Sequence, residues 1–200
     1  MKIMCRVLSN VGIDYQLANW LIWAPAHFDV EVVHTDSNGV TEWRNIVTGK
    51  DFLPSDADVL WFVDSDTIPP QTLKWLPLVQ DCDVFGLPYR GYTPRDVYWH
   101  VFKYMGVKKG KRHYGSIQRK DWPTSPTMEV DALGTGCTLI HRRVFEAMPK
   151  YPFNLIRNDD WTVGTEDMNF CYEARKKGFK VWASTKYTCG HVKDINLKDF

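Results

Sequence analysis

Three short segments with the apolar content of strands mark the first third of the chain, at residues 2–8, 28–35 and 59–63. The third is Val-Leu-Trp-Phe-Val, with no polar residue, which is typical of a strand buried on both faces of a sheet between helices. Segments with helical signals lie between the runs. This order of strands and helices predicts βαβ units, and therefore an α/β fold with a central, mostly parallel sheet flanked by helices.

Capping and breaking residues set the limits of the predicted helices. Asp14 can cap a helix that ends before Pro25, and Thr165 can cap one over residues 166–177 that Gly178 stops. Three more helices are predicted: one near 41–48 with Gly49 as its stop, one from Pro70 through Leu76, and one after His141.

The remaining chain predicts further strands and one region of different character. Runs at 83–90, 137–141 and 179–183 are expected to join the sheet. Residues 91–130 are aromatic, basic and poor in helical signals. A hairpin is predicted there with its tip at 108–111, and this charged tip is either a solvated turn or a phosphate contact.

Composition bounds the class of protein. The chain has 200 residues, of which 44% are hydrophobic and 24% charged, and a net charge of +1. One domain over 1–200 is expected, and no global field favours nucleic acid or an anionic membrane. No apolar run approaches the roughly 20 residues of a membrane-spanning helix, and no signal peptide is recognisable.

The five cysteines lack Cys-x-x-Cys spacing. We therefore expect small core residues, neither a disulfide framework nor a zinc site, and a reducing compartment. The expected location is cytoplasmic, with association at the periphery of a membrane left open.

The apolar run at 59–63 leads directly into Asp64-Ser65-Asp66. Open α/β sheets bind ligands at the carboxyl ends of their strands. Two carboxylates at a buried rim repel each other unless protons or a cation compensate, and a hard divalent metal is the natural cation. The alternative is an Asx turn. The chain has three Asp-x-Asp pairs, so the pattern alone does not decide.

Two later positions are also candidates for chemistry. Glu166 and Asp167 either complement the dipole of a first helical turn or supply a general base at the rim of a pocket. His191 is either structural or joins Asp64 and Asp66 in a mixed oxygen and nitrogen ligand set suited to Mn²⁺ or Mg²⁺.

Two earlier positions carry similar alternatives. Asp36 ends the second predicted strand, where it either forms an Asx turn or accepts hydrogen bonds from a base or ribose. Arg44 either balances a phosphate or is a solvated helix residue. The chain has no P-loop, no Gly-x-Gly-x-x-Gly after a strand and no Gly-x-Ser-x-Gly, which disfavours ATPases of the Walker type, dinucleotide-binding enzymes and serine hydrolases.

The order of these features resembles the GT-A class of nucleotide-sugar glycosyltransferases, particularly compact, inverting, family-2-like members. The similarity spans nearly the whole chain except about residues 91–127. The matching segments are Val32–Ser37, Arg44-Asn45, Leu60–Asp66, Val130–Arg143 with its Gly134-Thr135-Gly136, Glu166–Gly178 and Gly190-His191.

This resemblance implies a metal-dependent enzyme. It would move a sugar from a nucleoside-diphosphate sugar to a hydroxyl of a glycan, protein or lipid-linked acceptor, with inversion and without a nucleic-acid partner. Residues 1–90 would form the nucleotide-binding half and residues 91–200 the acceptor and catalytic half of one domain.

The resemblance also implies roles for individual residues. Asp167, with Glu166 beside it, would be the catalytic base, and Gly134, Thr135 and Trp161 would lie on the sugar or acceptor side. The implied residues for nucleotide sugar are Ser9, Asp36, Arg44, Asp64, Ser65 and Asp66. The implied ligands of Mn²⁺ or Mg²⁺ are Asp64, Asp66 and His191.

The chain departs from the family pattern in three places. Its first strand ends Leu8-Ser9-Asn10 without the usual proline, its second ends with the single acid Asp36, and the Gln-x-x-Arg-Trp of processive synthases is absent. Two other functions stay open. One is a non-catalytic nucleotide-sugar or carbohydrate-binding protein, and the other is a metal-dependent phosphoryl-transfer enzyme or nuclease, which predicts a larger basic surface.

Overall fold

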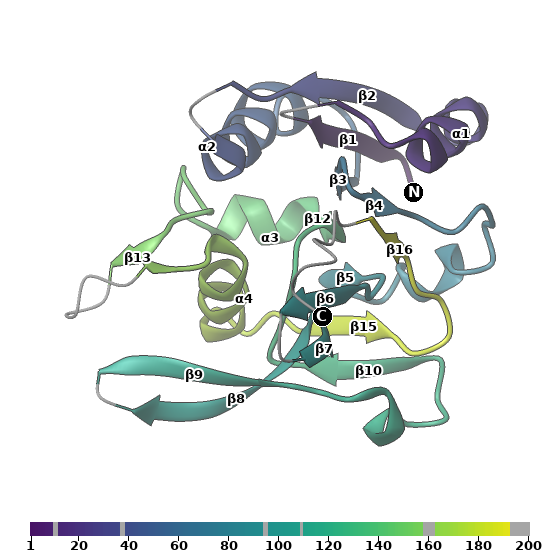
Figure 1. The fold of residues 1–200 in the computed structure, drawn as a ribbon. Coiled ribbons are helices and arrows are strands. Elements are labelled where there is room, and N and C mark those ends of the chain that lie inside the picture. The colour runs from purple at the N-terminus through teal and green to yellow at the C-terminus, as the bar shows by residue number, and fades with distance from the viewer. Residues whose placement is uncertain (10–11, 37–38, 94–95, 109, 158–162, 193–200) are drawn as a thin grey trace.

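A seven-stranded sheet forms the centre of the protein, as Figure 1 shows for the computed structural model, which describes residues 1–9, 12–36, 39–93, 96–108, 110–157 and 163–192. The strands follow one another across the sheet in the order β10 (Thr127–Val130), β15 (Val181–Ser184), β5 (Val84–Gly86), β12 (Cys137–His141), β3 (Val59–Asp64), β1 (Ile3–Ser9) and β2 (Asp29–His34).

The predicted parallel arrangement holds for most of this sheet. Strand β1 pairs in parallel with β2 and β3, and β15 pairs in parallel with β5. Strands β12 and β10 run against their neighbours, so five strands point one way and two the other. The mixed α/β class is therefore confirmed.

Helices cover both faces of the sheet. Helix α1 (Tyr15–Trp23) continues into the 3₁₀ turn η1 (Ala24–Ala26), and α2 (Gly39–Ile46) continues as a π-helix, η2 (Val47–Phe52). The others are α3 (Arg142–Ala147), α4 (Glu166–Lys176), and the 3₁₀ turns η3 (Leu76–Leu78) and η4 (Arg119–Asp121). Asp14 caps α1 as predicted, since its side chain accepts from the amide of Gln16 at 2.8 Å.

Alternating side chains of the strands divide the core into two clusters, one on each face. Along β3, Trp61 packs with α1, whereas Leu60 and Phe62 pack with η2, α3 and α4. Trp61 lies edge-on to Trp20 and Trp75, at centroid distances of 5.3 and 5.0 Å, and all three indoles are fully buried. The apolar run at 59–63 is thus buried on both faces, as its composition predicts.

Smaller sheets surround the central one. Strand β8 (Val101–Lys108) pairs with β9 (Lys111–Ser116) and β11 (Ala132–Leu133), which confirms the predicted hairpin. The other antiparallel pairs are β6 (Arg90–Thr93) with β7 (Asp96–Trp99), β4 (Thr67–Ile68) with β16 (Gly190–His191), and β13 (Ile156–Arg157) with β14 (Val163–Gly164).

One predicted helix does not form, and the bounds of two other predicted elements are wrong. No helix follows Pro70; only the short turn η3 forms there, since Pro69, Pro70 and Pro77 lack amide hydrogens. The helical run after residue 39 passes through Gly49 to Phe52. The strand predicted over 83–90 ends at Gly86. In addition, Thr165 occupies the N-cap position of α4 without a side-chain capping bond.

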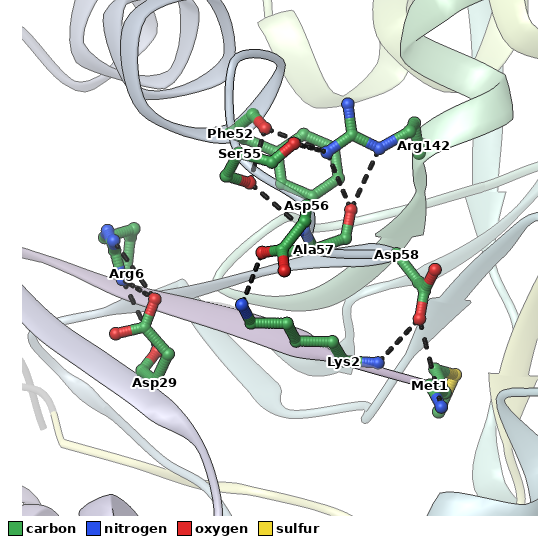
Figure 2. A network of polar contacts seen from close by, with 10 residues as sticks. All are labelled: Met1, Lys2, Arg6, Asp29, Phe52, Ser55, Asp56, Ala57, Asp58 and Arg142. Carbon is green, nitrogen blue, oxygen red and sulfur yellow. Dashed lines mark hydrogen bonds and ion pairs between the residues drawn. The ribbon is translucent and has the colours of Figure 1, made fainter.

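A polar network joins the segments that enter the sheet at the amino-terminal ends of β1 and β3 (Figure 2). The guanidinium of Arg142 donates to the carbonyl oxygens of Phe52, Leu53, Ser55 and Ala57 at 2.7–3.0 Å. These carbonyls lie at the end of η2 and in the turn before β3. Arg142 therefore fixes the entry of the strand that leads to Asp64.

All five cysteines are buried, as predicted for small core residues, and the structure shows them as free thiols. Within the described residues, no helix is long and apolar enough to cross a membrane.

Candidate functional site

The candidate site lies at the carboxyl ends of the central strands. A pocket of about 290 Å³ opens there beside the end of β3. Its charged lining comes from α2, β3, the turn after it, α4 and β16, namely Arg44, Asp64, Asp66, Glu166, Asp167 and His191. This placement brings together residues that are up to 147 positions apart in the sequence, so their convergence is a property of the fold.

Arg44 is the centre of this site, and its side chain is only 2% exposed. Its Nη2 donates to Oδ1 and Oδ2 of Asp64, at 2.8 and 3.1 Å. Its Nη1 donates to Oε1 of Glu166 and lies 3.9 Å from Oδ1 of Asp167. Its Nε has no hydrogen-bond partner among the described residues. Arg44 is therefore not a solvated helix residue; it ties β3 to the start of α4.

Three carboxylates surround this one guanidinium, so the fully ionised cluster holds an excess of two negative charges. Burial by itself lowers the pKa of Arg44, but Asp64, Asp167 and Glu166 outweigh it and raise that pKa. Burial raises the pKa of Asp64 despite the opposing effect of Arg44. Burial and the charge of Asp167 raise the pKa of Glu166 to about 7. The cluster is thus electrostatically suited to take up a proton or a cation.

Asp66 and His191 meet at the rim of the pocket because β16 pairs with β4, with His191 opposite Thr67. Nε2 of His191 lies 3.2 Å from Oδ2 of Asp66, and Nδ1 contacts the carbonyl oxygen of Arg90. Because a carbonyl only accepts, we infer that Nδ1 donates to it, which leaves Nε2 as the ring nitrogen that faces Asp66. A backbone carbonyl on the other nitrogen is a common support for a metal-binding histidine.

Among the described residues, no group of three or more His, Cys, Asp and Glu is arranged to hold a metal ion. Asp66 and His191 supply one carboxylate and one imidazole, whereas Arg44 engages both oxygens of Asp64. The predicted ligand set is therefore only partly assembled. The pair fits a metal that takes its other ligands from phosphate oxygens and water, as Mg²⁺ commonly does.

The segment Gly134-Thr135-Gly136 forms a close backbone cradle under the pocket. A Cβ at Gly134 would lie 2.3 Å from the hydroxyl oxygen of Tyr89, and one at Gly136 would lie 2.8 Å from the same atom and 3.1 Å from Oδ2 of Asp64. The amide of Gly136 donates to that hydroxyl at 3.2 Å. These glycines thus make room for Tyr89, a residue of the protein itself.

Asp167 sits against the same segment, where its Oδ2 accepts from the amide of Thr135 at 3.3 Å. Its side chain is 19% exposed, and that of Glu166 is 11% exposed. Thr135 is fully buried, and its hydroxyl has no partner among the described residues. Asp167 is therefore the more accessible of the two adjacent acids, and its orientation is set by Thr135.

Ser9, Asp36 and Ser65 were predicted to hold the nucleoside. They lie at or just after the carboxyl ends of three neighbouring strands, on the same edge of the sheet. The amide of Thr35 donates to the carbonyl of Ser9 at 2.7 Å, and Oγ of Ser9 donates to the carbonyl of Gly12 at 2.7 Å. Asp36 is exposed and accepts from Nε1 of Trp43 at 3.0 Å. The amide of Ser65 donates to the carbonyl of Leu8 at 3.0 Å. Trp161 lies outside the described residues.

Sequence reasoning missed an aromatic wall. Tyr89, Tyr92, Tyr98 and His100 line the pocket opposite the carboxylates, and Tyr89 stacks on His100 with a centroid distance of 4.4 Å. The aromatic, basic composition of residues 91–130 singled out the region. Nothing in its periodicity distinguishes the side chains that face the pocket from those that pack elsewhere.

The fold and this site together define a GT-A-like α/β domain. No protein-family model and no curated protein matches the sequence. Among solved structures, the crystal structure of A197 from STIV has a TM-score of 0.68 at 18% identity, covering 97% of this chain and 87% of that one.

A second solved structure shares the architecture. It is GalNAc-T7 with UDP, GalNAc and Mn²⁺, with a TM-score of 0.60 at 11% identity, covering 98% of this chain. This chain spans only 44% of the length of GalNAc-T7. At such low identity, both similarities establish the fold alone.

Proposed function

We propose that this protein is a metal-dependent glycosyltransferase that moves a sugar from a nucleoside-diphosphate sugar to an acceptor hydroxyl, with inversion. The observation that carries this proposal is that Asp64, Glu166 and Asp167, which surround Arg44, line one pocket together with the pair of Asp66 and His191. The fold shared with GalNAc-T7, whose structure contains UDP, GalNAc and Mn²⁺, supports it.

In this proposal the nucleoside lies against the ends of β1 and β2. Asp36 accepts hydrogen bonds from the base or ribose, the segment at Ser9 contacts the nucleoside, and Asp64 with Ser65 lies towards the ribose and diphosphate. Residues 1–90 then form the nucleotide-binding half, and residues 91–200 supply the acceptor side.

Asp66 and His191 would hold Mn²⁺ or Mg²⁺, with Asp64 joining them if the donor displaces part of its contact with Arg44. A metal bound there supplies positive charge for the diphosphate as it departs. Arg44 adds a fixed, always-protonated cation behind the carboxylates, because its pKa is raised.

Asp167 is the proposed general base. It takes the proton from the acceptor hydroxyl while that oxygen attacks the anomeric carbon on the face opposite the leaving diphosphate. Thr135 orients Asp167 through its amide, and Glu166 is held by Arg44 in a positioning role. Gly134 and Thr135 form the floor of the sugar and acceptor side, and Trp161 remains a proposed stacking residue.

A screen of nucleotide sugars by thermal shift, with and without Mn²⁺, tests the donor class. We expect one group of donors to raise the melting temperature only when the metal is present, and to be consumed when acceptors are added. Absence of any metal-dependent shift across uridine, guanosine and cytidine donors would contradict the proposal.

Asp66→Asn tests the metal assignment. We expect loss of metal-dependent turnover with an unchanged melting temperature in chelator, because Asp66 is at the rim and not in the core. Asp56→Asn is the matched control, since that exposed aspartate lies at the opposite end of β3. Full activity of Asp66→Asn would exclude this residue as a ligand.

Asp167→Asn tests the base. The proposed role predicts that the rate of sugar transfer falls by roughly two to four orders of magnitude while donor affinity is retained, because only proton transfer is removed. Calorimetric titration of donor in the presence of Mn²⁺ checks the affinity. Collapse of donor binding together with the transfer rate would show that Asp167 serves the donor and not the acceptor.

The second candidate function is a non-catalytic nucleotide-sugar or carbohydrate-binding protein. One observation favours it: the carboxylate of Asp167 already accepts from an amide and faces Arg44, so it is engaged by contacts within the protein. Tight metal-dependent donor binding, with neither hydrolysis nor transfer to any acceptor in the screen, would select this function.

A further inference from the structure

Basic side chains are concentrated on the β8–β9 hairpin and the segment that follows it. Residues 97–120 contain seven Lys or Arg and no Asp or Glu, although the chain as a whole has a net charge of only +1. The other residues therefore sum to −6. The near-neutral total conceals a strongly positive segment, which the overall composition did not reveal.

Not all of these cations are available to a partner. Arg112 lies over the ring of Tyr172, with 3.4 Å from its guanidinium carbon to the ring centroid, and donates to Asn169 at 3.2 Å. Lys103 and Lys108 are exposed, and neither has a carboxylate partner among the residues that the structure describes. These two lysines thus carry charge that the fold does not use.

Exposed aliphatic side chains lie between these lysines on the same strand. Met105 is 68% exposed and Val107 is 64% exposed. Gly106, at φ +95°, marks an irregularity in the pairing of β8 with β9. Met105 lies on the same face of β8 as Lys103 and Lys108, whereas the register shift turns Val107 to the opposite face, which it shares with Arg112. A face that offers cationic and aliphatic side chains together suits the interfacial layer of an anionic bilayer, where headgroups meet the lysines and acyl chains meet the aliphatic group.

The hairpin is also rooted next to the candidate site. Val101 at the start of β8 pairs with Leu133, and His100 just before it lines the pocket. The strand has eight residues, which places its far end roughly 23 Å from this root at about 3.3 Å per residue. A contact at the tip would therefore fix the orientation of the pocket relative to the surface that the tip touches.

We propose that the β8–β9 hairpin docks the protein on an anionic lipid surface, with Lys103 and Lys108 against headgroup phosphates and Met105 in the interfacial layer. The proposal does not depend on the reaction. If the pocket acts as proposed above, docking would present it to acceptors that are held at the membrane.

Vesicle co-sedimentation of the full chain tests this docking. We expect binding to phosphatidylcholine vesicles with about 30% phosphatidylglycerol, little binding to pure phosphatidylcholine, and weaker binding at high salt. The double variant Lys103→Glu/Lys108→Glu should lose at least about tenfold in affinity. Met105→Ser should lose several-fold in affinity at a salt concentration where the contribution of the charges is screened.

The control is Lys50→Glu/Lys74→Glu, which reverses two exposed lysines outside the hairpin; it should bind like the wild type. Melting temperatures of all variants check that they fold. Equal binding of the Lys103/Lys108 variant, or no vesicle binding by the wild type, would overturn the proposal. So would fluorescence anisotropy showing that the wild type binds a short single-stranded RNA but not vesicles, which would make the hairpin a nucleic-acid surface.

Discussion

Two arginines at opposite ends of β3 have contrasting environments. Arg142, at the amino-terminal end, donates to four neutral carbonyl groups, of which Figure 2 shows those of Phe52, Ser55 and Ala57. Arg44, at the carboxyl end, faces three carboxylates and leaves its Nε without a partner among the described residues. The guanidinium of Arg142 has hydrogen-bond partners that carry no charge, whereas the ionised cluster around Arg44 holds more negative than positive charge.

This difference separates a structural anchor from a cluster of titratable groups. Carbonyl groups do not titrate, so the contacts of Arg142 are the same at every physiological pH. The carboxylates around Arg44 repel one another, which makes their cluster responsive to protons and cations. Strand β3 is therefore anchored by Arg142 where it begins, and it ends at carboxylates that respond to protons and cations.

The largest expected effect comes from Arg44→Met. Removal of one partner from a buried ionic cluster should lower the free energy of unfolding by about 4 kcal/mol at about pH 8 in chelator. The loss should be smaller at about pH 5. Without Arg44, the folded-state pKa values of the acids around it rise further. The protonated acids then contribute stability to the variant that is fully present below their unfolded-state pKa values and is lost as the pH rises. Urea denaturation at both pH values measures this, and an equal loss at both would break the contrast.

Arg142→Met should cost about 3 kcal/mol, because several carbonyl groups lose a charged donor and only some are open to water. The loss should be the same at both of these pH values. The neighbouring Arg143 is the control: it is 49% exposed and pairs with Asp83 at 2.7 Å, so Arg143→Met should cost less than about 1 kcal/mol. A strong pH dependence for Arg142→Met would contradict its neutral role.

Gly134→Ala should cost about 2 kcal/mol, since the new methyl group would overlap the hydroxyl of Tyr89 and crowd His100. The contrasting substitution is Gly49→Ala in η2, where nothing lies within 4 Å of the added carbon. That change should stabilise the protein by about 0.5–1 kcal/mol. Thermal unfolding of both variants tests whether the backbone is packed more closely near Arg44, at the carboxyl end of β3, than in η2.

The smallest predicted effect concerns pH. The pKa of Glu166, raised from 4.5 to about 7, contributes stability that is present below pH 4.5 and is lost as the pH rises towards 7. Glu166→Gln should remove this dependence, which is on the order of 1 kcal/mol for the single pH unit between about pH 5 and 6. The exposed Glu146→Gln on α3 is the control. A wild-type stability that increases over this range in chelator would show that Glu166 is held fully ionised.

Much of the architecture of residues 1–90 could be predicted because its signals are local. The run at 59–63 identified β3, and Asp14 identified the start of α1. The predicted helix after Pro70 failed where local signals conflict. Its apolar spacing suits a helix, but three prolines remove donors, and the buried Trp75 is held by Trp61 and Phe28 instead.

The candidate site was predictable as a set of residues and not as an arrangement. Asp64, Asp66, Asp167 and His191 were singled out from their positions at strand and helix ends, and they line one pocket. The role of Arg44 was not foreseen, since neither a phosphate contact nor a solvated position predicts a buried guanidinium between three acids. The aromatic wall was located only as a region.

The sequence by itself determined which segments become strands and helices, because periodicity, capping and breaking residues act over a few positions. It also determined the types of chemical group at the edge of the sheet. Only the tertiary structure decided that β12 runs against β3, that Tyr89 fills the space over Gly134, and that Arg44 meets Asp64 and Glu166. Each of these depends on contacts between residues that are far apart in the sequence, and the free energy of such contacts comes from packing and desolvation that no local pattern encodes.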